Sequence, residues 1–143
     1  MNYKPILIVG GEPNSIFLEI FFKTLKFKKI KSPLILITSE EILKKQMKKF
    51  NFKKKIRLID LDKIEYYKLD NRTVNLINIS SAINKSKSFI RESFEIAFKI
   101  IRLKISYKLI NGPINKTQFL NRKFLGMTEY ISRKFNINNV AML

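Results

Sequence analysis

The sequence predicts an α/β fold with three layers, α/β/α, in which helices cover both faces of a largely parallel sheet. Short apolar runs alternate along the chain with longer segments in which apolar residues recur at helical spacing. This alternation is typical of a parallel sheet, because parallel strands are joined by crossovers that usually contain a helix. The 143 residues, 45% hydrophobic and 28% charged, also have the composition of a folded domain.

The first predicted elements are a strand, a helix and a second strand. The apolar run Ile6–Val9 is expected to form a buried strand, and Gly10-Gly11-Glu12-Pro13 breaks it into a turn. A helix is expected over Ser15–Lys26. Ser32-Pro33 then introduces the strand Leu34–Ile37.

A second helix is expected directly after this strand. Thr38 and Glu41 have the spacing of a capping box, which predicts that Thr38 caps the helix. The helix has an apolar face and a lysine face, formed by Ile42, Leu43, Gln46, Met47 and Phe50 and by Lys44, Lys45, Lys48 and Lys49. The lysine face is expected to be solvated.

The rest of the chain continues the alternation. The pattern predicts strands over Lys55–Asp60 and Thr73–Ile79, on either side of the polar stretch 62–71. A helix over Ser88–Leu103 and a strand over Ser106–Ile110 follow. The chain then continues with helices over Thr117–Asn121 and Thr128–Phe135 and a final apolar run, Val140–Leu143. The apolar stripe of the long helix, which includes Phe94, Phe98 and Ile101, is expected to lie in the core.

The residue types restrict the chemistry that these 143 residues can perform. The chain contains no cysteine and no histidine. Disulfides, thiolate nucleophiles and a Ser-His-Asp triad are therefore excluded within it. Any chemistry must depend on carboxylates, lysines, hydroxyls, amides or the backbone.

The formal net charge of +18 suggests an anionic partner such as a nucleic acid. However, lysine outnumbers arginine by 23 to 6, whereas base and phosphate recognition relies on the planar, bidentate guanidinium. We therefore favour a solvated lysine surface, and nucleic-acid binding is the less favoured alternative.

Apolar runs such as Ile6–Val9 are far shorter than the roughly 20 residues that span a bilayer. The first residues also lack the longer apolar stretch of a signal peptide. The expected location is therefore cytoplasmic, with no membrane partner.

Two loops follow predicted strands at the position where open parallel sheets bind ligands. In Gly10-Gly11-Glu12-Pro13-Asn14-Ser15, the glycines allow close approach of the backbone, and the amides that begin the next helix could hold an anion. In Asn111-Gly112-Pro113-Ile114-Asn115-Lys116, a Gly-Pro turn precedes an amide and an ammonium group. Lys116 could hold a phosphate as a point charge.

These loops belong to three motifs that together resemble one enzyme family. The family is that of the 4-hydroxythreonine-4-phosphate dehydrogenases. Its motif P-I-x-I-T-x-G-[DE]-P-A-G-I-G-P-E-I resembles residues 5–20, and its motif T-[AG]-P-I-N-K resembles Asn111-Gly112-Pro113-Ile114-Asn115-Lys116. Its third motif, G-H-T-E-[FY], resembles Leu125-Gly126-Met127-Thr128-Glu129-Tyr130, and the three occur in the same order in this chain. The resemblance spans essentially the whole chain.

The resemblance implies an NAD- or NADP-dependent oxidation, with decarboxylation, of a phosphorylated amino acid, 4-phosphooxy-L-threonine, in pyridoxal 5'-phosphate synthesis. It also implies a divalent metal, a cleft between two α/β domains and a homodimer. By position, Asn115 and Lys116 would bind substrate, Gly11, Glu12 and Pro13 would shape the floor of the cleft, and Thr128 and Glu129 would flank the metal. Residues 1–110 would form the N-terminal α/β domain, and 111–143 would begin the second domain.

One departure from the family pattern bears directly on activity. The position of a metal-ligand histidine in the family is occupied by Met127, whose soft, neutral thioether is a poor ligand for the expected cation. We therefore expect no metal site of the family kind and no turnover by this chain alone. Two alternatives remain open: a non-catalytic dimerisation or binding module derived from the family, and a basic nucleic-acid-binding domain.

Overall fold

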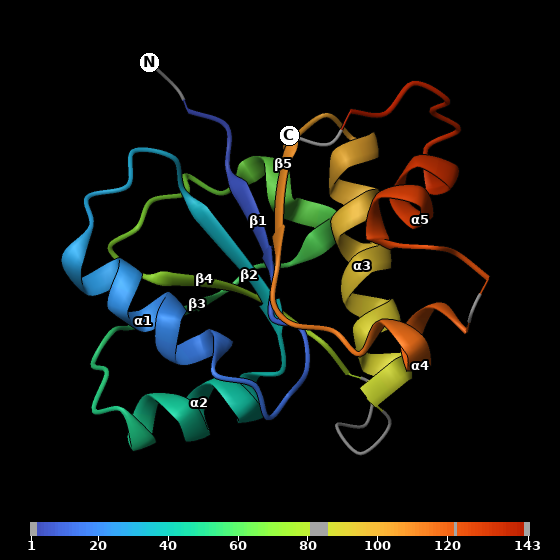
Figure 1. Ribbon diagram of the computed structural model, residues 1–143. Coiled ribbons are helices and arrows are strands. Elements are labelled where there is room, and N and C mark those ends of the chain that lie inside the picture. Colours follow the sequence, from blue (N-terminus) through green and yellow to red (C-terminus); the bar gives the residue numbers. More distant parts are fainter. Residues whose placement is uncertain (1–2, 81–85, 122, 142–143) are drawn as a thin grey trace. The chain divides into compact units, whose positions relative to one another are not determined.

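Five short strands form one sheet, and all of its strand pairs are parallel. A computed structural model, shown in Figure 1, describes residues 3–80, 86–121 and 123–141. The strands are β1 (Ile6–Val9), β2 (Leu34–Thr38), β3 (Ile56–Leu58), β4 (Val74–Asn78) and β5 (Lys108–Asn111). Their order in the sheet is β3-β4-β2-β1-β5. The predicted parallel sheet is therefore confirmed.

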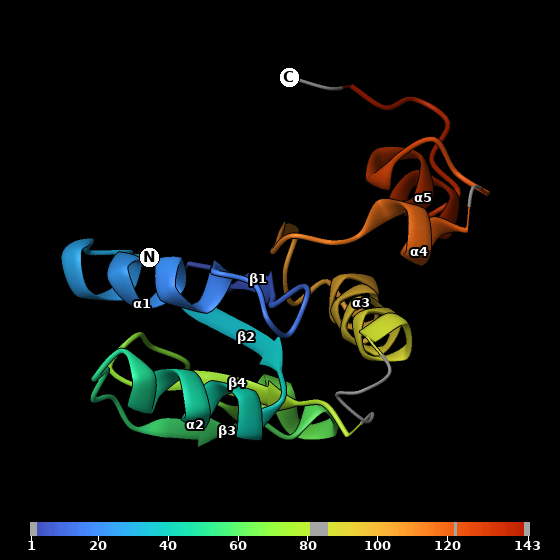
Figure 2. The same ribbon diagram turned by 60° about the horizontal axis from the view of Figure 1, so that its bottom comes forward.

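Helices cover both faces of this sheet. The helices α1 (Phe17–Phe27) and α2 (Glu40–Lys49) lie on one face, and α3 (Ser86–Arg102) lies on the other (Figures 1 and 2). The connections through α1 and α2 run across the sheet in one direction, and the connection through α3 runs in the other. Because crossovers between parallel strands are right-handed, opposite directions place the helices on opposite faces. The three-layer prediction is confirmed.

The core lies between the sheet and these helices. Its fully buried side chains include Leu7, Ile35, Leu36, Leu43, Leu76, Phe89, Phe94 and Phe98. The predicted stripe of α3 is buried except for Ile101, which is half-buried, while Ile100 takes the buried position beside it. The lysine face of α2 is exposed at all four positions, as predicted.

The predicted cap of α2 is wrong. Thr38 is the last residue of β2, where it pairs with Asn78 of β4, and Ser39 occupies the N-cap position without a side-chain cap hydrogen bond. The Asn78 side chain supplies the cap instead, since its Oδ1 accepts a hydrogen bond of 2.8 Å from the backbone N–H of Glu40. The sheet ladder therefore extends one residue further than the apolar run.

The polar stretch 62–71 contains a 3₁₀ helix that the pattern did not predict. This element, η1 (Leu61–Tyr66), begins at Asp60, whose carboxylate accepts a hydrogen bond from the N–H of Asp62, and it buries Ile64. Asn71 then ties the stretch to the turn before β2 through hydrogen bonds with residues 30, 32 and 34. Long-range contacts thus order a segment with little apolar character.

The chain divides into two units, Met1–Pro113 and Ile114–Leu143. The second unit contains α4 (Lys116–Leu120) and α5 (Met127–Lys134), which are held together by edge-to-face contacts of Tyr130 with Phe119 and Phe124. In the final apolar run, Val140 and Ala141 are irregular, and Met142 and Leu143 lie outside the described residues. The domain boundary at residue 110 stays a prediction.

Among the helices of the described segments, none is long and apolar enough to cross a membrane.

Candidate functional site

The carboxyl ends of β1 and β5 form the switch point of the sheet. β1 lies between β2 and β5 in the sheet. The connection from β1 to β2 and the connection from β4 to β5 run across the sheet in opposite directions, so the strand order reverses between β1 and β5. Loops that follow neighbouring strands at such a point diverge and leave room for a ligand. Both loops singled out in the sequence begin here, after Val9 and after Asn111.

The two loops touch through their backbones. The N–H of Glu12 donates a hydrogen bond of 2.9 Å to the carbonyl oxygen of Pro113, and the N–H of Gly112 donates one of 2.8 Å to that of Val9. The first motif and the beginning of the second, about 100 residues apart in the sequence, therefore form one structure. Gly11, Glu12 and Pro13 lie where the resemblance places a cleft floor, and that role stays a prediction.

Glycine is required at two positions of this contact. Gly11 has a φ of 72°, and a Cβ atom on it would lie 2.5 Å from the Pro113 carbonyl oxygen. A Cβ atom on Gly112 would lie 2.5 Å from the Gly10 carbonyl oxygen and 2.8 Å from Cγ of Phe17. All three distances are well inside van der Waals contact, so any larger residue would push the loops apart.

Thr38 is a neighbour of this site that the sequence interpretation assigned to another role. It is 2% exposed, and its Oγ1 lies 3.1 Å from the place that a Cβ of Gly10 would take. In the sequence, the feature that could have indicated a site residue is the position of this hydroxyl side chain at the end of a predicted strand. Without knowledge of the strand order, this signal could not connect Thr38 with Gly10.

Asn115 and Lys116 belong to the second unit, where they begin α4. Asn115 is the N-cap, and its Oδ1 accepts a hydrogen bond of 3.1 Å from the N–H of Gln118. Lys116 is exposed and lines a cavity of about 280 Å³ together with Thr117, Leu120, Phe124 and Leu125. The substrate-binding roles of Asn115 and Lys116 stay predictions.

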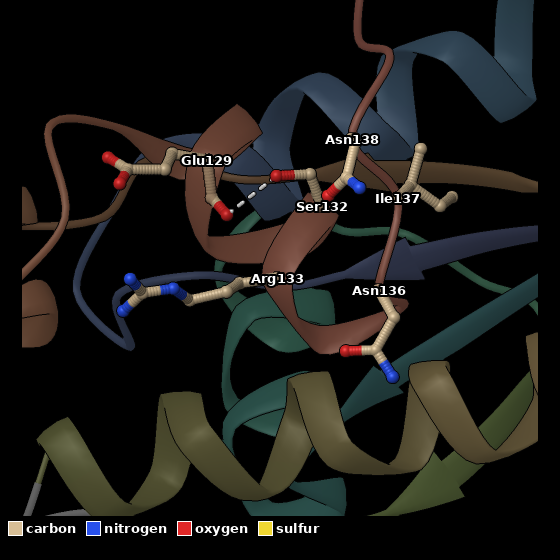
Figure 3. Close-up of a pocket in the computed structure, with 6 residues that line it drawn as sticks. All are labelled: Glu129, Ser132, Arg133, Asn136, Ile137 and Asn138. Atoms are coloured by element: carbon tan, nitrogen blue, oxygen red, sulfur yellow. Dashed lines mark hydrogen bonds between the residues drawn. The ribbon is translucent and has the colours of Figure 1, made fainter.

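The third motif forms the first turn of α5. Met127, Thr128 and Glu129 are all half-buried there, and Oε2 of Glu129 accepts a hydrogen bond of 2.7 Å from the N–H of Leu125. Glu129 also lines a cavity of about 400 Å³ with Ser132, Arg133, Asn136, Ile137 and Asn138 (Figure 3). Lys116 and Glu129 therefore line separate cavities of the second unit.

The residues at the third motif do not fit a divalent metal. Met127 offers a thioether where the family pattern has an imidazole, and hard or borderline cations bind thioethers poorly. Within residues 3–80, 86–121 and 123–141, no three acidic, histidine or cysteine side chains gather as a ligand set.

Two side chains with shifted pKa values lie before strands, at the amino edge of the sheet. Hydrogen bonds from Arg72 lower the pKa of Asp70, which precedes β4. Lys4 lowers the pKa of Tyr107, which precedes β5, and its Nζ lies 4.0 Å from the centre of the tyrosine ring. The loops after β1 and β5 are at the opposite edge, so these two groups do not mark the candidate site.

No protein-family model matches the chain, and no curated protein matches it. Among solved structures, it is similar to a 4-hydroxythreonine-4-phosphate dehydrogenase from Burkholderia phymatum, with 17% sequence identity and a TM-score of 0.77, over 96% of this chain and 45% of that chain. It is also similar to one from Klebsiella pneumoniae, with 17% identity and a TM-score of 0.74, over 91% of this chain and 44% of that chain. The chain thus spans less than half the length of these enzymes, and it has the fold of that part of a 4-hydroxythreonine-4-phosphate dehydrogenase.

Proposed function

We propose that this chain is a divergent N-terminal half of a 4-hydroxythreonine-4-phosphate dehydrogenase, and that it binds the phosphorylated amino-acid substrate without oxidising it alone. The reaction would be the oxidation of 4-phosphooxy-L-threonine with decarboxylation, in which NAD or NADP accepts the hydride. The residues that complete catalysis would come from outside these 143 residues.

One observation carries the proposal. The loops that the family motifs single out are in backbone contact at the switch point, where Glu12 N–H donates to the Pro113 carbonyl oxygen over 2.9 Å. The switch point is the general ligand position of open parallel sheets. Both motifs therefore contribute to one loop contact at the position where such a sheet would bind a ligand.

The chain's own residues would bind and orient the substrate. Gly11 and Gly112 allow the two loop backbones to pack directly against each other, which would fix the loops in position at the switch point. The exposed ammonium of Lys116 would hold the substrate phosphate as a point charge. Met127 explains why no turnover is expected from the chain alone, because the metal implied by the family has no suitable ligand there.

Calorimetric titration with 4-phosphooxy-L-threonine tests binding. Lys116→Ala is expected to weaken binding by at least about tenfold, since one charged hydrogen bond contributes roughly 1.5–3 kcal/mol. Lys48→Ala is the matched control, because it removes an equally exposed lysine from α2 and changes the net charge by the same amount. Equal effects of the two substitutions, or no saturable binding by the wild type, would contradict the proposal.

An absorbance assay for reduced nicotinamide separates binding from turnover. The chain with substrate, NAD or NADP and a divalent cation is expected to produce no reduced cofactor. Turnover by the chain alone would show that Met127 does not abolish the activity. Binding without turnover is equally expected of the non-catalytic module derived from the family. Mixing a Met127→His variant of the chain with the C-terminal half of a related enzyme would distinguish the two, because only a divergent half would then restore turnover.

A further inference from the structure

One cavity of the first unit lies at the amino edge of the sheet, opposite the loops that follow β1 and β5. It has a volume of about 380 Å³, and one wall is formed by residues 3–5 before β1, Pro33 before β2 and Ile105 before β5. The other wall comes from η1 and the segment that follows it, up to Leu69. Parallel strands begin at one edge of a sheet, so these segments, far apart in the sequence, converge there. We call this space the amino-edge cavity.

The walls of the amino-edge cavity are largely apolar. Pro5 and Ile64 are buried, and Pro33, Leu69 and Ile105 are half-buried. Cavities of about 300–1,000 Å³ with apolar walls and a few polar groups are typical of small-molecule sites. At about 380 Å³, this cavity has room for a small ligand with an apolar body.

Ring side chains form much of the remaining lining. Tyr3 and Tyr67 line the cavity together with the two prolines. Tyrosine and proline rings present flat faces, against which an aromatic ring packs with a large contact area. The hydroxyl oxygen of Tyr67 accepts a hydrogen bond of 3.3 Å from the N–H of Asp60, and the same hydroxyl carries a hydrogen that it can donate. The lining therefore favours an aromatic ligand that carries a hydrogen-bond acceptor.

Lysines give this edge of the sheet a positive charge. The cavity lining includes Lys4 and Lys68, and both are exposed. Nζ of Lys4 lies 4.0 Å from the ring centre of Tyr107, and Lys4, with a smaller contribution from Lys104, lowers the pKa of that phenol. A negative charge is therefore favoured at this edge, while Glu65 adds a carboxylate to the lining. Two lysines and one carboxylate together favour a ligand with a single negative charge.

We propose that the amino-edge cavity binds a small aromatic monocarboxylate. Its ring would pack against Pro5, Pro33 and Leu69, and its carboxylate would accept charge-assisted hydrogen bonds from the lysine ammonium groups. This site is separate from the one proposed for the phosphorylated substrate, because the loops after β1 and β5 lie at the opposite edge of the sheet. A ligand here would connect η1 with the starts of β1, β2 and β5, and it would thereby stabilise the first unit.

Titration of the full chain with 2-naphthoate, followed by amide NMR, tests the proposal. Saturable shifts are expected at the amides of Ile64, Leu69 and Ile105, with a dissociation constant on the order of 1 mM for a ligand of this size. The alcohol 2-naphthylmethanol keeps the rings but lacks the charge, so it should bind about two- to fivefold more weakly. An absence of saturable shifts, shifts centred on Gly11 and Gly112, or equal binding of the alcohol would overturn the proposal.

Substitutions of the two kinds of charged lining residue should have opposite effects. Lys68→Gln should weaken 2-naphthoate binding by about two- to fivefold, as expected for the loss of an exposed ion pair, and Glu65→Gln should strengthen it by a similar factor. Lys45→Gln and Glu41→Gln, at exposed positions of α2, change the net charge by the same amounts and should leave the dissociation constant unchanged. If each variant matches its control, the overall charge of the protein attracts the anion, and the proposal is wrong.

A larger side chain tests the cavity itself. Ile105→Trp should fill part of the space and abolish the shifts, whereas Leu103→Trp, at a 48% exposed position outside the lining, should leave them unchanged. The amide spectrum of each variant without 2-naphthoate checks that the variant is folded. Unchanged binding by folded Ile105→Trp would place the probe elsewhere and overturn the proposal. If Ile105→Trp does not fold, the opposite effects expected of Lys68→Gln and Glu65→Gln decide the question.

Discussion

Replacement of Gly112 by alanine should separate the two loops of the candidate site. The added Cβ would lie 2.5 Å from the Gly10 carbonyl oxygen, 3.0 Å from the Gly10 carbonyl carbon and 2.8 Å from the ring of Phe17. Ordinary contacts between such atoms are about 3.5 Å, so one loop must move by roughly 1 Å. Two of these neighbours are backbone atoms of a buried strand end and cannot turn aside.

The expected cost follows from the contacts that this movement strains. Overpacking of a tight site costs about 1–3 kcal/mol, and the nearby hydrogen bond from Gly112 N–H to the Val9 carbonyl oxygen contributes about 1 kcal/mol more. We expect the free energy of unfolding of the first unit to fall by about 2–4 kcal/mol. For a chain of this size, the midpoint of thermal unfolding should fall by roughly 6–12 °C.

Differential scanning calorimetry of three variants measures this effect. Gly126→Ala is the control, because no atom lies within 4 Å of its Cβ and its φ is −165°, so a change below about 0.5 kcal/mol is expected. Gly10→Ala should be intermediate, since its nearest neighbour is the Thr38 side chain at 3.1 Å. If Gly112→Ala is no more destabilising than Gly10→Ala, the close packing of the loops does not restrict residue 112.

Three further substitutions test the supports of the sheet. Asn71→Ala removes three hydrogen bonds to residues 30–34 and should lower the free energy of unfolding, measured by urea denaturation, by about 2–3 kcal/mol. Asn14 is exposed, so the control Asn14→Ala should change the free energy of unfolding by less than about 0.5 kcal/mol. Ser106→Ala leaves the buried carbonyl oxygen of Pro5 without its 2.7 Å hydrogen bond and should cost about 1–3 kcal/mol in the same assay; a smaller loss would show that water reaches this oxygen. Asp70→Asn tests a pH effect. Because the pKa of Asp70 is lowered in the folded state, the carboxylate stabilises the fold above the unfolded carboxyl pKa of about 3.9, and this stabilisation is lost as the pH falls below that value. The variant should therefore be less stable than the wild type at pH 6, and its stability should decline less steeply on acidification.

Most of the fold could be predicted from the sequence because its strands are short apolar runs with clear breaks. Ile6–Val9 was predicted with its observed bounds, and the other strands were predicted to within a few residues. The errors occur where a distant residue decides the local structure. Asn78, on another strand, caps α2, and burial of Ile64 helps to order η1 in a polar stretch. No local pattern contains that information.

The candidate site could be predicted only in part from the sequence. The two loops could be found as turns after strands, but their contact depends on β1 and β5 being neighbours, and the strand order is not written in the sequence. The family resemblance gave the order of the motifs along the chain, and the hydrogen bond from Glu12 to Pro113 shows that the first two are in contact. The helical pattern alone also does not show that Ile20 and Phe27 of α1 are exposed while Phe21 and Phe22 are buried.

The two groups of candidate residues should respond differently to mutation. The contact between Gly11 and Pro113 is part of the packing of the first unit, so a substitution there changes stability and binding together. Lys116 is exposed on a short helix, so Lys116→Ala can change binding with little change in the unfolding midpoint. A variant of Lys116 that lowers both equally would imply that this lysine has a structural role, and the case for a substrate phosphate at this position would then fail. Measurement of both quantities on the same variants therefore distinguishes a ligand site from a tightly packed turn.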